Sequence, residues 1–200
     1  MPSAMTKVSV IRPARKTDAA LLARLINAAG EGIPGFIWST MAEGGETPLQ
    51  IGQQRAAREQ GGFSYRNAQV AEVDGEVAGM VLGYRQPDPY DSDGIEELPV
   101  VVRPLVELES LAPGSWYLNG IATLEEYRGR GIGSALLQAA EAVARQSSAK
   151  AISLIVAAEN SGAKRLYERN GYRPQGQRPL EPWPGCEYSG DWLLLVKDLN

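Results

Sequence analysis

A glycine-rich segment between a buried strand and an amphipathic helix constrains this chain more than any other feature. The segment, residues 125–134, reads Glu-Glu-Tyr-Arg-Gly-Arg-Gly-Ile-Gly-Ser. Residues 116–122 before it form an apolar run typical of a buried strand, and apolar side chains at helical spacing follow from Leu136. Glycines let successive amides converge, and a helix start adds unpaired N–H groups and a positive dipole end. The segment is therefore suited to hold a phosphate or diphosphate, with Arg128 and Arg130 adding charge.

Two familiar phosphate-binding loops fit this segment poorly. A Walker loop needs Lys and then Ser or Thr after its last glycine, whereas this chain has Ile132-Gly133-Ser134. The dinucleotide fingerprint G-x-G-x-x-G, counted from Gly129, meets Gly131 and then Ser134. The acid expected about 20 residues further on in that fingerprint is not evident. A glycine-rich turn with solvated arginines is the alternative interpretation.

Hydrophobic periodicity and turn residues predict alternating strands and helices along the chain. The predicted strands cover residues 8–11, 69–73, 76–84, 116–122, 151–156 and 192–196. The second and third of these form a predicted hairpin, because Asp74-Gly75 supplies a two-residue turn between them. The predicted helices run from Thr17 to Gly30, from Thr47 to about Glu59, from the glycine-rich segment through Ala144, and from Asn160 to Asn170. Residues 31–45 are rich in glycine, which indicates a loop or a broken helix. This order predicts an α/β (α+β) fold with a mixed sheet and helices on both faces, in a single domain over residues 1–200.

Residues 86–115 differ in character from the segments on either side. They hold five prolines, and they carry seven acidic side chains against the single basic residue Arg103, for a net charge of −6. We expect an acidic, proline-rich insertion between two strands, with a short helix over residues 102–111. Residues 118–170 carry seven basic and five acidic side chains, for a net charge of +2. The positive part coincides with the proposed phosphate-binding segment.

The chain has no histidine, one cysteine and a formal net charge of −4. Without histidine, a Ser-His-Asp triad, a Cys-His dyad and the zinc motif H-E-x-x-H are all excluded. Proton transfer near neutral pH must therefore use a carboxylate, Tyr, Lys, Cys, the amino terminus or water. The negative charge argues against general nucleic-acid binding, and no apolar run is long enough for a membrane span or a secretory leader. We expect a cytoplasmic protein without a metal, a nucleic-acid partner or a membrane partner.

Two linked motifs suggest a family. The pattern Arg-x-x-Gly-x-Gly at Arg128, Gly131 and Gly133 resembles the acetyl-CoA motif of the GNAT family of N-acetyltransferases. Residues 160–172 are similar to the family's segment N-x-x-A-x-x-x-Y-x-x-x-G-F/Y, and residues 121–124 to its splayed fourth strand. The resemblance implies a GNAT-like mixed, mostly antiparallel sheet of six to seven strands, with helices on both faces and a splayed central strand pair.

The resemblance also implies acetyl-CoA as co-substrate. Backbone groups of Ile121 and Thr123 would pair with the pantetheine arm, and amides from Gly129 to Ser134 would hold the pyrophosphate. Asn160 would bind the pantetheine or cap its helix, and Arg128 would bind phosphate or brace the loop. The predicted cofactor-binding residues are Ile121, Thr123, Arg128, Gly129, Arg130, Gly131, Ile132, Gly133, Ser134, Asn160, Ala163 and Tyr167.

For catalysis, the resemblance implies direct attack of an amine on the acetyl carbonyl. Tyr167 would protonate the leaving thiolate; the alternative for Tyr167 is a packed aromatic. The backbone N–H of Ile121 would stabilise the tetrahedral oxyanion. The family has no universal base position, so the candidate bases are the carboxylates of Glu31, Glu107 and Glu109, each with the alternative of a solvated surface acid.

The acceptor is expected to be a primary amine, either a small cationic amine or a peptide amine. The negative charge of residues 86–115 supports a cationic acceptor, because this family often shapes its acceptor pocket there; an acidic loop that aids solubility is the alternative. A homodimer is expected from the family. A non-catalytic acyl-CoA-binding or sensor module of the same fold is the alternative function, and an unrelated nucleotide-binding protein is a third.

Overall fold

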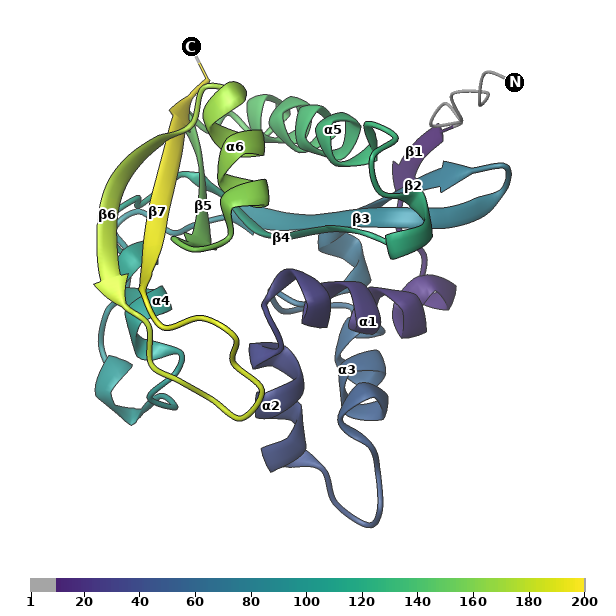
Figure 1. Ribbon diagram of the computed structural model, residues 1–200, viewed down its shortest axis with the longest axis horizontal. Coiled ribbons are helices and arrows are strands. Elements are labelled where there is room, and N and C mark those ends of the chain that lie inside the picture. The colour runs from purple at the N-terminus through teal and green to yellow at the C-terminus, as the bar shows by residue number, and fades with distance from the viewer. Residues whose placement is uncertain (1–9, 200) are drawn as a thin grey trace. The chain divides into compact units, whose positions relative to one another are not determined.

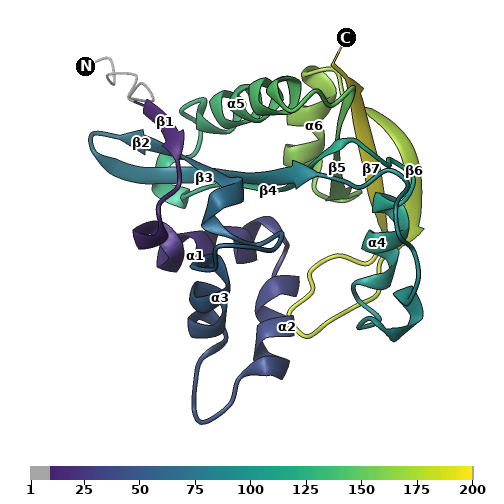
Figure 2. The ribbon, with the colours of Figure 1, turned by 180° about the vertical axis from the view of Figure 1, so that it is seen from behind.

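The computed structural model describes residues 10–199, which form two compact units (Figures 1 and 2). One unit comprises the chain up to Gly83 together with Gly120–Ala140, and the other comprises Tyr84–Asn119 together with the chain from Glu141. Seven strands follow the order β1-β2-β3-β4-β5-β7-β6. The pairs β1–β2, β2–β3, β5–β7 and β7–β6 are antiparallel, and the pair of β4 and β5 is parallel. The predicted mixed, mostly antiparallel sheet is confirmed, whereas a single domain over residues 1–200 stays a prediction.

Three strands belong to the first unit. They are β1 (Val10–Pro13), β2 (Ala68–Val73) and β3 (Glu76–Arg85), the last of which ends in the second unit. The predicted hairpin is confirmed, because β2 and β3 pair antiparallel on either side of a two-residue turn with positive φ at both positions. The predicted first strand included Val8 and Ser9, which lie outside the described residues.

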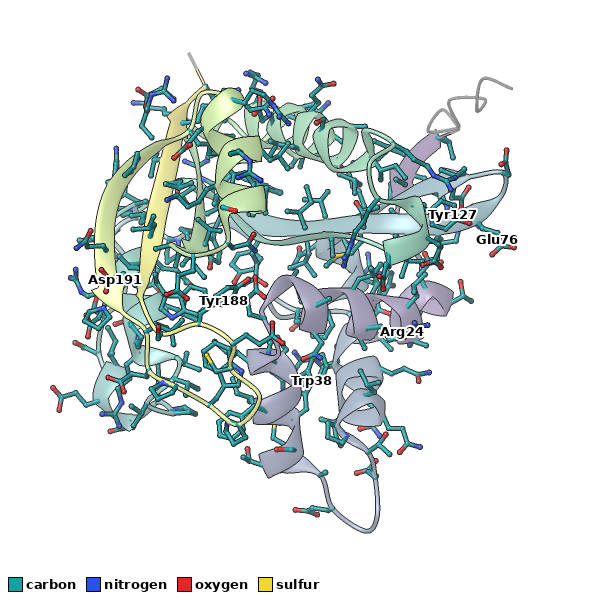
Figure 3. All side chains as sticks on the ribbon, viewed as in Figure 1. Arg24, Trp38, Glu76, Tyr127, Tyr188 and Asp191 are labelled. Atoms are coloured by element: carbon teal, nitrogen blue, oxygen red, sulfur yellow. The ribbon has the colours of Figure 1, made fainter. Side chains whose placement is uncertain are left out.

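Three helices follow β1 in the same unit: α1 (Ala19–Ala29), α2 (Ile33–Met41) and α3 (Pro48–Ala56). The segment predicted as a loop or a broken helix is therefore largely helical. Its helix α2 carries the buried Trp38 (Figure 3). The Trp38 ring stacks on Phe63 with centroids 5.6 Å apart. Helix α3 begins with a capping box between Thr47 and Gln50 and ends sooner than the predicted Glu59.

Helices lie on both faces of the sheet in the first unit, as predicted. Helix α1 runs along one face, and the first half of α5 (Ile132–Gln146) runs along the other (Figures 1 and 2). A Cβ at Gly120 would lie 2.5 Å from the end of the Ile26 side chain and 3.2 Å from Ala29 Cβ, both on α1, so a side chain at this position would crowd the helix. On β3, a Cβ at Gly79 would lie 3.2 Å from Leu136 of α5.

The second unit holds the first half of β4 (Trp116–Thr123) and the strands β5 (Ala151–Ala157), β6 (Arg173–Pro179) and β7 (Asp191–Asp198). Strand β4 pairs with β5 from Trp116 opposite Ile152 to Leu118 opposite Leu154. Strand β7 pairs along all of β5 and also with β6. The three-residue parallel pair is short, as expected of a splayed central pair.

The acidic insertion also belongs to the second unit. It begins after β3 and ends at β4, as predicted, and it contains helix α4 (Arg103–Glu109), which is shorter than the predicted 102–111. Its two ends are joined by backbone hydrogen bonds from Gln86 N–H to Ser115 O at 2.8 Å and from Gly114 N–H to Pro87 O at 3.1 Å. The insertion is thus a closed loop that leaves the sheet and returns to it at one place.

Candidate active site

The second half of β4 presents one backbone edge away from β3. Leu124 N–H donates to Ala78 O of β3 at 2.8 Å, and the carbonyl of Ala122 also faces β3, close to Gly79. Successive residues of a strand point their backbone groups to alternate sides. The N–H and C=O groups of Ile121 and Thr123 therefore face the opposite edge, which is the orientation that a strand-like ligand arm requires.

The glycine-rich loop that follows β4 adopts a backbone that depends on glycine. Gly129 has φ of 74° and Gly131 has φ of 80°, both in the left-handed region that side chains disfavour. A Cβ at either position would meet no atom within 4 Å, so backbone conformation rather than space requires glycine there. Both residues are exposed, as an anion-binding loop must be.

The loop leads directly into helix α5, whose first amides have no acceptor within the helix. The first helical hydrogen bond runs from Ala135 N–H to Gly131 O at 3.1 Å. The amides of Ile132, Gly133 and Ser134 precede it and lie at the positive end of a 15-residue helix. These amides and the two left-handed glycines together form an anion-binding arrangement.

The two arginines of the loop differ in what they contact. Arg130 Nη2 donates to Glu126 O at 2.9 Å, and its guanidinium lies over the Tyr127 ring at 5.2 Å from the centroid. Figure 3 shows Tyr127 at the turn between β4 and α5. Arg130 therefore braces the loop, a role that the sequence analysis considered for Arg128. The Arg128 side chain is exposed, and its backbone N–H closes the preceding turn on Glu125 O.

Asn160 caps helix α6 (Ser161–Arg169) in the second unit. Its Oδ1 accepts a hydrogen bond from Ala163 N–H at 3.1 Å, and its carbonyl accepts one from Lys164 N–H at 3.0 Å. The predicted cap is therefore confirmed, and the amide of Ala163 is one of the groups it satisfies. A ligand role for Asn160 stays a prediction.

Tyr167 is held in a packed position on α6. Its side chain is 6% exposed, and its ring lies 5.8 Å from that of Tyr172 at a tilt of 59°. Tyr172 is fixed in turn, since its hydroxyl donates to Glu141 at 3.3 Å and Lys197 Nζ donates to the same carboxylate at 2.8 Å. This packing restrains the Tyr167 ring. Such restraint suits a proton donor, and it is equally typical of a structural aromatic.

The candidate bases lie in different surroundings. Glu107 pairs with Arg178 of β6 at 2.6 Å, and both side chains are about two-fifths exposed, at 43% and 37%. Glu31 lies in the turn between α1 and α2, in the first unit, with φ of 53°. Glu109, at the end of α4, is partly buried and is contacted by several neutral donors instead of a cation.

The donors around Glu109 come from segments far apart in the sequence. Gln86 Nε2 donates to Glu109 Oε2 at 3.0 Å, the hydroxyl of Tyr90 donates to the same oxygen at 3.1 Å, and Tyr117 of β4 also hydrogen-bonds the carboxylate. The ring of Tyr84 packs edge-on to that of Tyr117 with centroids 5.9 Å apart. We call the set Tyr84, Gln86, Tyr90, Glu109 and Tyr117 the Glu109 cluster.

Burial shifts the titration of this cluster. Desolvation raises the pKa of Glu109 above its usual value, and the hydrogen bonds from Gln86, Tyr90 and Tyr117 oppose part of that rise. Desolvation, followed by the nearby Glu109 charge, also raises the pKa of Tyr84, Tyr90 and Tyr117. The phenols therefore stay protonated donors near neutral pH.

The predicted site residues thus fall into two groups. The strand edge, the glycine loop and the start of α5 are together in the first unit, while Asn160, Tyr167, Glu107 and Glu109 belong to the second. Glu109 was among the predicted bases, whereas the tyrosines were not predicted, because they occupy three segments with no shared periodicity. The useful signal was Tyr90, an aromatic side chain amid the acidic residues of the insertion.

Neither a membrane-spanning helix nor a metal-binding group of side chains occurs in the described residues. No helix within residues 10–199 is long and apolar enough to cross a membrane. In the same part of the chain, no three side chains among Cys, Asp and Glu gather so that they could hold a metal ion.

Comparison with known proteins identifies the family. The Acetyltransferase (GNAT) family matches residues 36–172, more than half of the chain. The chain therefore belongs to the GNAT family, and the resemblance stated from the two sequence motifs is confirmed. The match covers the glycine loop and the segment from Asn160 to Tyr172.

Individual relatives agree with this assignment. An N-alpha-acetyltransferase of Sulfurisphaera tokodaii is 34% identical over 105 residues, which is 52% of this chain and 54% of that protein. The match thus spans about half the length of this curated relative. A crystal structure described as an acetyltransferase is 26% identical with a TM-score of 0.67, and the alignment covers 96% of this chain and all of the other.

A third relative shares the fold and was solved with a ligand. It is the NatC complex bound to Gag peptide and CoA, 16% identical with a TM-score of 0.59, covering 96% of this chain and 98% of the other. At this identity the likeness shows the fold alone. The GNAT fold thus binds CoA in at least one relative.

Proposed function

We propose that this protein transfers the acetyl group of acetyl-CoA to a primary amine by direct attack. The observation that carries the proposal is the glycine loop, which joins outward-facing backbone groups on β4 to the unpaired first amides of α5. Membership of the GNAT family supports acetyl transfer as the chemistry. The acceptor would be a small cationic amine or a peptide amine.

Acetyl-CoA would be held mostly by backbone groups. The amides from Gly129 to Ser134 suit the pyrophosphate, because they lead into a helix start. None of these residues has an acidic side chain that would repel an anion. The backbone of Ile121 and Thr123 would pair with the pantetheine arm as an added strand does. Both arginines of the loop are exposed, but the Arg130 guanidinium contacts Glu126 O and the Tyr127 ring. Arg128 would therefore be the one that approaches the phosphates.

Besides the cofactor, the reaction needs a donor to the oxyanion, a proton donor to the thiolate and a base for the amine. The amine nitrogen attacks the thioester carbon, and the carbonyl oxygen takes the negative charge, which the Ile121 N–H would stabilise. Collapse of this intermediate breaks the carbon–sulfur bond and releases a thiolate. The hydroxyl of Tyr167 would protonate that sulfur, since a donor within reach lowers the cost of its departure.

The attacking nitrogen must be unprotonated, so a base is also needed. Of the two bases predicted on α4, Glu109 fits the task better than Glu107. Burial raises the Glu109 pKa towards neutrality, which makes it a stronger proton acceptor. Glu107 is held by Arg178, and a carboxylate in an ion pair accepts a proton less readily.

The proposal can be tested in two steps. Thermal unfolding with acetyl-CoA, CoA, ATP and NAD should show stabilisation by the two CoA species and not by the nucleotides. No shift with either CoA species would contradict the proposal. Thiol release over a panel of primary amines then separates an enzyme from a non-catalytic acyl-CoA-binding module, which would bind acetyl-CoA and release no thiol with any amine.

A further inference from the structure

The Glu109 cluster contains a carboxylate whose partners are all neutral. Gln86 and Tyr90 donate to Oε2 at 3.0 and 3.1 Å, and Tyr117 supplies a third hydrogen bond. A partly buried carboxylate is usually paired with a cation or hydrogen-bonded in full. A carboxylate has about four acceptor positions, so three donors leave it able to accept another.

The nearby basic side chains of the second unit are engaged elsewhere. Arg178 pairs with Glu107, and Arg103 Nε donates to Leu98 O at 2.9 Å. Arg85 Nη1, from the end of β3, donates to Ser147 O at 3.0 Å. Burial and the three neutral donors set the pKa of Glu109, and no cation contributes to it. The negative charge of Glu109 is thus left for a ligand to neutralise.

Aromatic rings border the same carboxylate. The rings of Tyr84 and Tyr117 pack edge to face, at an interplanar angle of 70°. Asn119 Nδ2 approaches the Tyr84 hydroxyl at 3.5 Å and is exposed, while Tyr84 and Tyr90 are partly exposed. Tyrosine faces attract organic cations, with the strongest effect where water is excluded. A carboxylate with tyrosine neighbours at a partly open surface suits an alkylammonium ion.

We propose that the Glu109 cluster binds the acceptor amine as its ammonium ion and thereby selects primary alkylammonium substrates. The assignment rests on the acetyltransferase function proposed above and adds its substrate class. An ammonium N–H would donate to the remaining acceptor position of Glu109, and the alkyl chain would lie against the partly exposed rings of Tyr84 and Tyr90. The net charge of −6 over residues 86–115 draws a cation to this region.

The same contact prepares the amine for attack. A proton passes from the bound R–NH₃⁺ to the Glu109 carboxylate, which gives R–NH₂ and a neutral carboxylic acid. The nitrogen lone pair is then available, and no further reactant is consumed. The transfer is helped because burial holds the Glu109 pKa above its usual value, nearer to that of an amine.

Cation binding can be measured without any acetyl transfer. The probe pair is butylamine, a cation at neutral pH, and butan-1-ol, its neutral counterpart of similar size. Both are titrated into the full-length protein in the absence of acetyl-CoA, and the side-chain amide signals of Gln86 are followed by NMR, since that amide donates to Glu109. We expect butylamine to bind at least tenfold more tightly than butan-1-ol.

Variants connect the binding to the cluster. Glu109→Gln should reduce butylamine affinity at least tenfold, because it removes the charge and keeps the shape. Tyr90→Phe should reduce it by a smaller factor, since it removes one donor to the carboxylate. Glu97→Gln is the matched control, an exposed glutamate of the same insertion, and should bind butylamine as the unchanged protein does.

The outcomes separate this inference from the proposed function. Equal affinity for butylamine and butan-1-ol, or full butylamine binding by Glu109→Gln with an intact fold by circular dichroism, overturns the inference even if acetyl transfer is observed. Butylamine binding that Glu109→Gln abolishes, together with no thiol release from any amine, supports the cation site and overturns the acetyltransferase proposal. Binding, loss on Glu109→Gln, and thiol release from butylamine support both.

Discussion

The glycine loop and the Glu109 cluster are built in opposite ways. The loop uses consecutive residues and backbone amides, and its shape is set by left-handed glycines and a helix start. The cluster uses side chains from β3, the insertion and β4, and its character is set by burial. A site made of consecutive backbone groups can be recognised from a sequence, whereas a site assembled from distant side chains requires the fold.

The largest expected effect concerns Tyr167. Tyr167→Phe removes the proposed proton donor and keeps the ring that packs on Tyr172. We expect the rate of thiol release to fall about 100-fold, the lower end for loss of a general acid, with unchanged stabilisation by acetyl-CoA. The matched control is Tyr172→Phe, which removes the hydrogen bond to Glu141 from the other ring of the pair. A Tyr167→Phe enzyme with full activity would show that Tyr167 is a packed aromatic only.

The next effect tests the loop itself. Gly131→Ala places a side chain at φ of 80°, a strain of about 1–2 kcal/mol that the loop can relieve by losing its shape. The expected result is acetyl-CoA affinity about tenfold weaker by calorimetry, since tenfold corresponds to about 1.4 kcal/mol. Butylamine binding should not change.

The control for the loop is another glycine with the same kind of backbone. Gly75, in the β2–β3 turn, has φ of 84°, and a Cβ there would meet no atom within 4 Å. Gly75→Ala should cost similar stability and leave acetyl-CoA affinity unchanged. If both variants weaken acetyl-CoA binding equally, the loop is not the binding site.

A smaller effect is expected in the pH dependence of stability. Since the folded-state pKa of Glu109 is raised, its contribution to stability is complete below the usual carboxyl pKa and is lost as the pH rises through the raised value. Glu109→Gln removes this loss. Urea unfolding over a pH series should therefore show the variant gaining stability relative to the unchanged protein as the pH rises. A difference that is independent of pH would contradict the raised pKa.

The smallest effect concerns Glu107. Glu107→Gln breaks the partly exposed ion pair with Arg178, which should cost up to about 1 kcal/mol in the free energy of unfolding. The measurement is urea unfolding at low and high salt, because screening should shrink the difference. A much larger fall of thiol release in Glu107→Gln than in Glu109→Gln would instead identify Glu107 as the base.

Much of the fold follows from local signals in the sequence. The β2–β3 hairpin, the helix after the glycine loop and the Asn160 cap were predicted because each depends on neighbouring residues. Residues 31–45 were left open as a loop or a broken helix, because glycines at 32, 44 and 45 flank helix α2 and Gly35 lies within it. The helix is held by tertiary contacts such as that of Trp38 with Phe63. Long-range packing of this kind leaves no period in the sequence.

The candidate site divides along the same line. The glycine loop and Tyr167 were predicted from motifs, while the bracing role went to Arg130 because only the fold brings its guanidinium over Tyr127. Glu109 could be named as an acid of the insertion but not told apart from Glu107. Burial and an Arg178 contact 71 residues away distinguish them.

The joined ends of the insertion bear on how this enzyme type can diversify. Hydrogen bonds from Gln86 to Ser115 and from Gly114 to Pro87 fix the points where the loop leaves and rejoins the sheet. The length of the loop between these points can then change with little loss of stability, since doubling a loop adds about 0.6 kcal/mol to the free energy of closing it. Evolution or engineering can therefore exchange the residues proposed to bind the amine while the residues proposed to hold acetyl-CoA stay as they are.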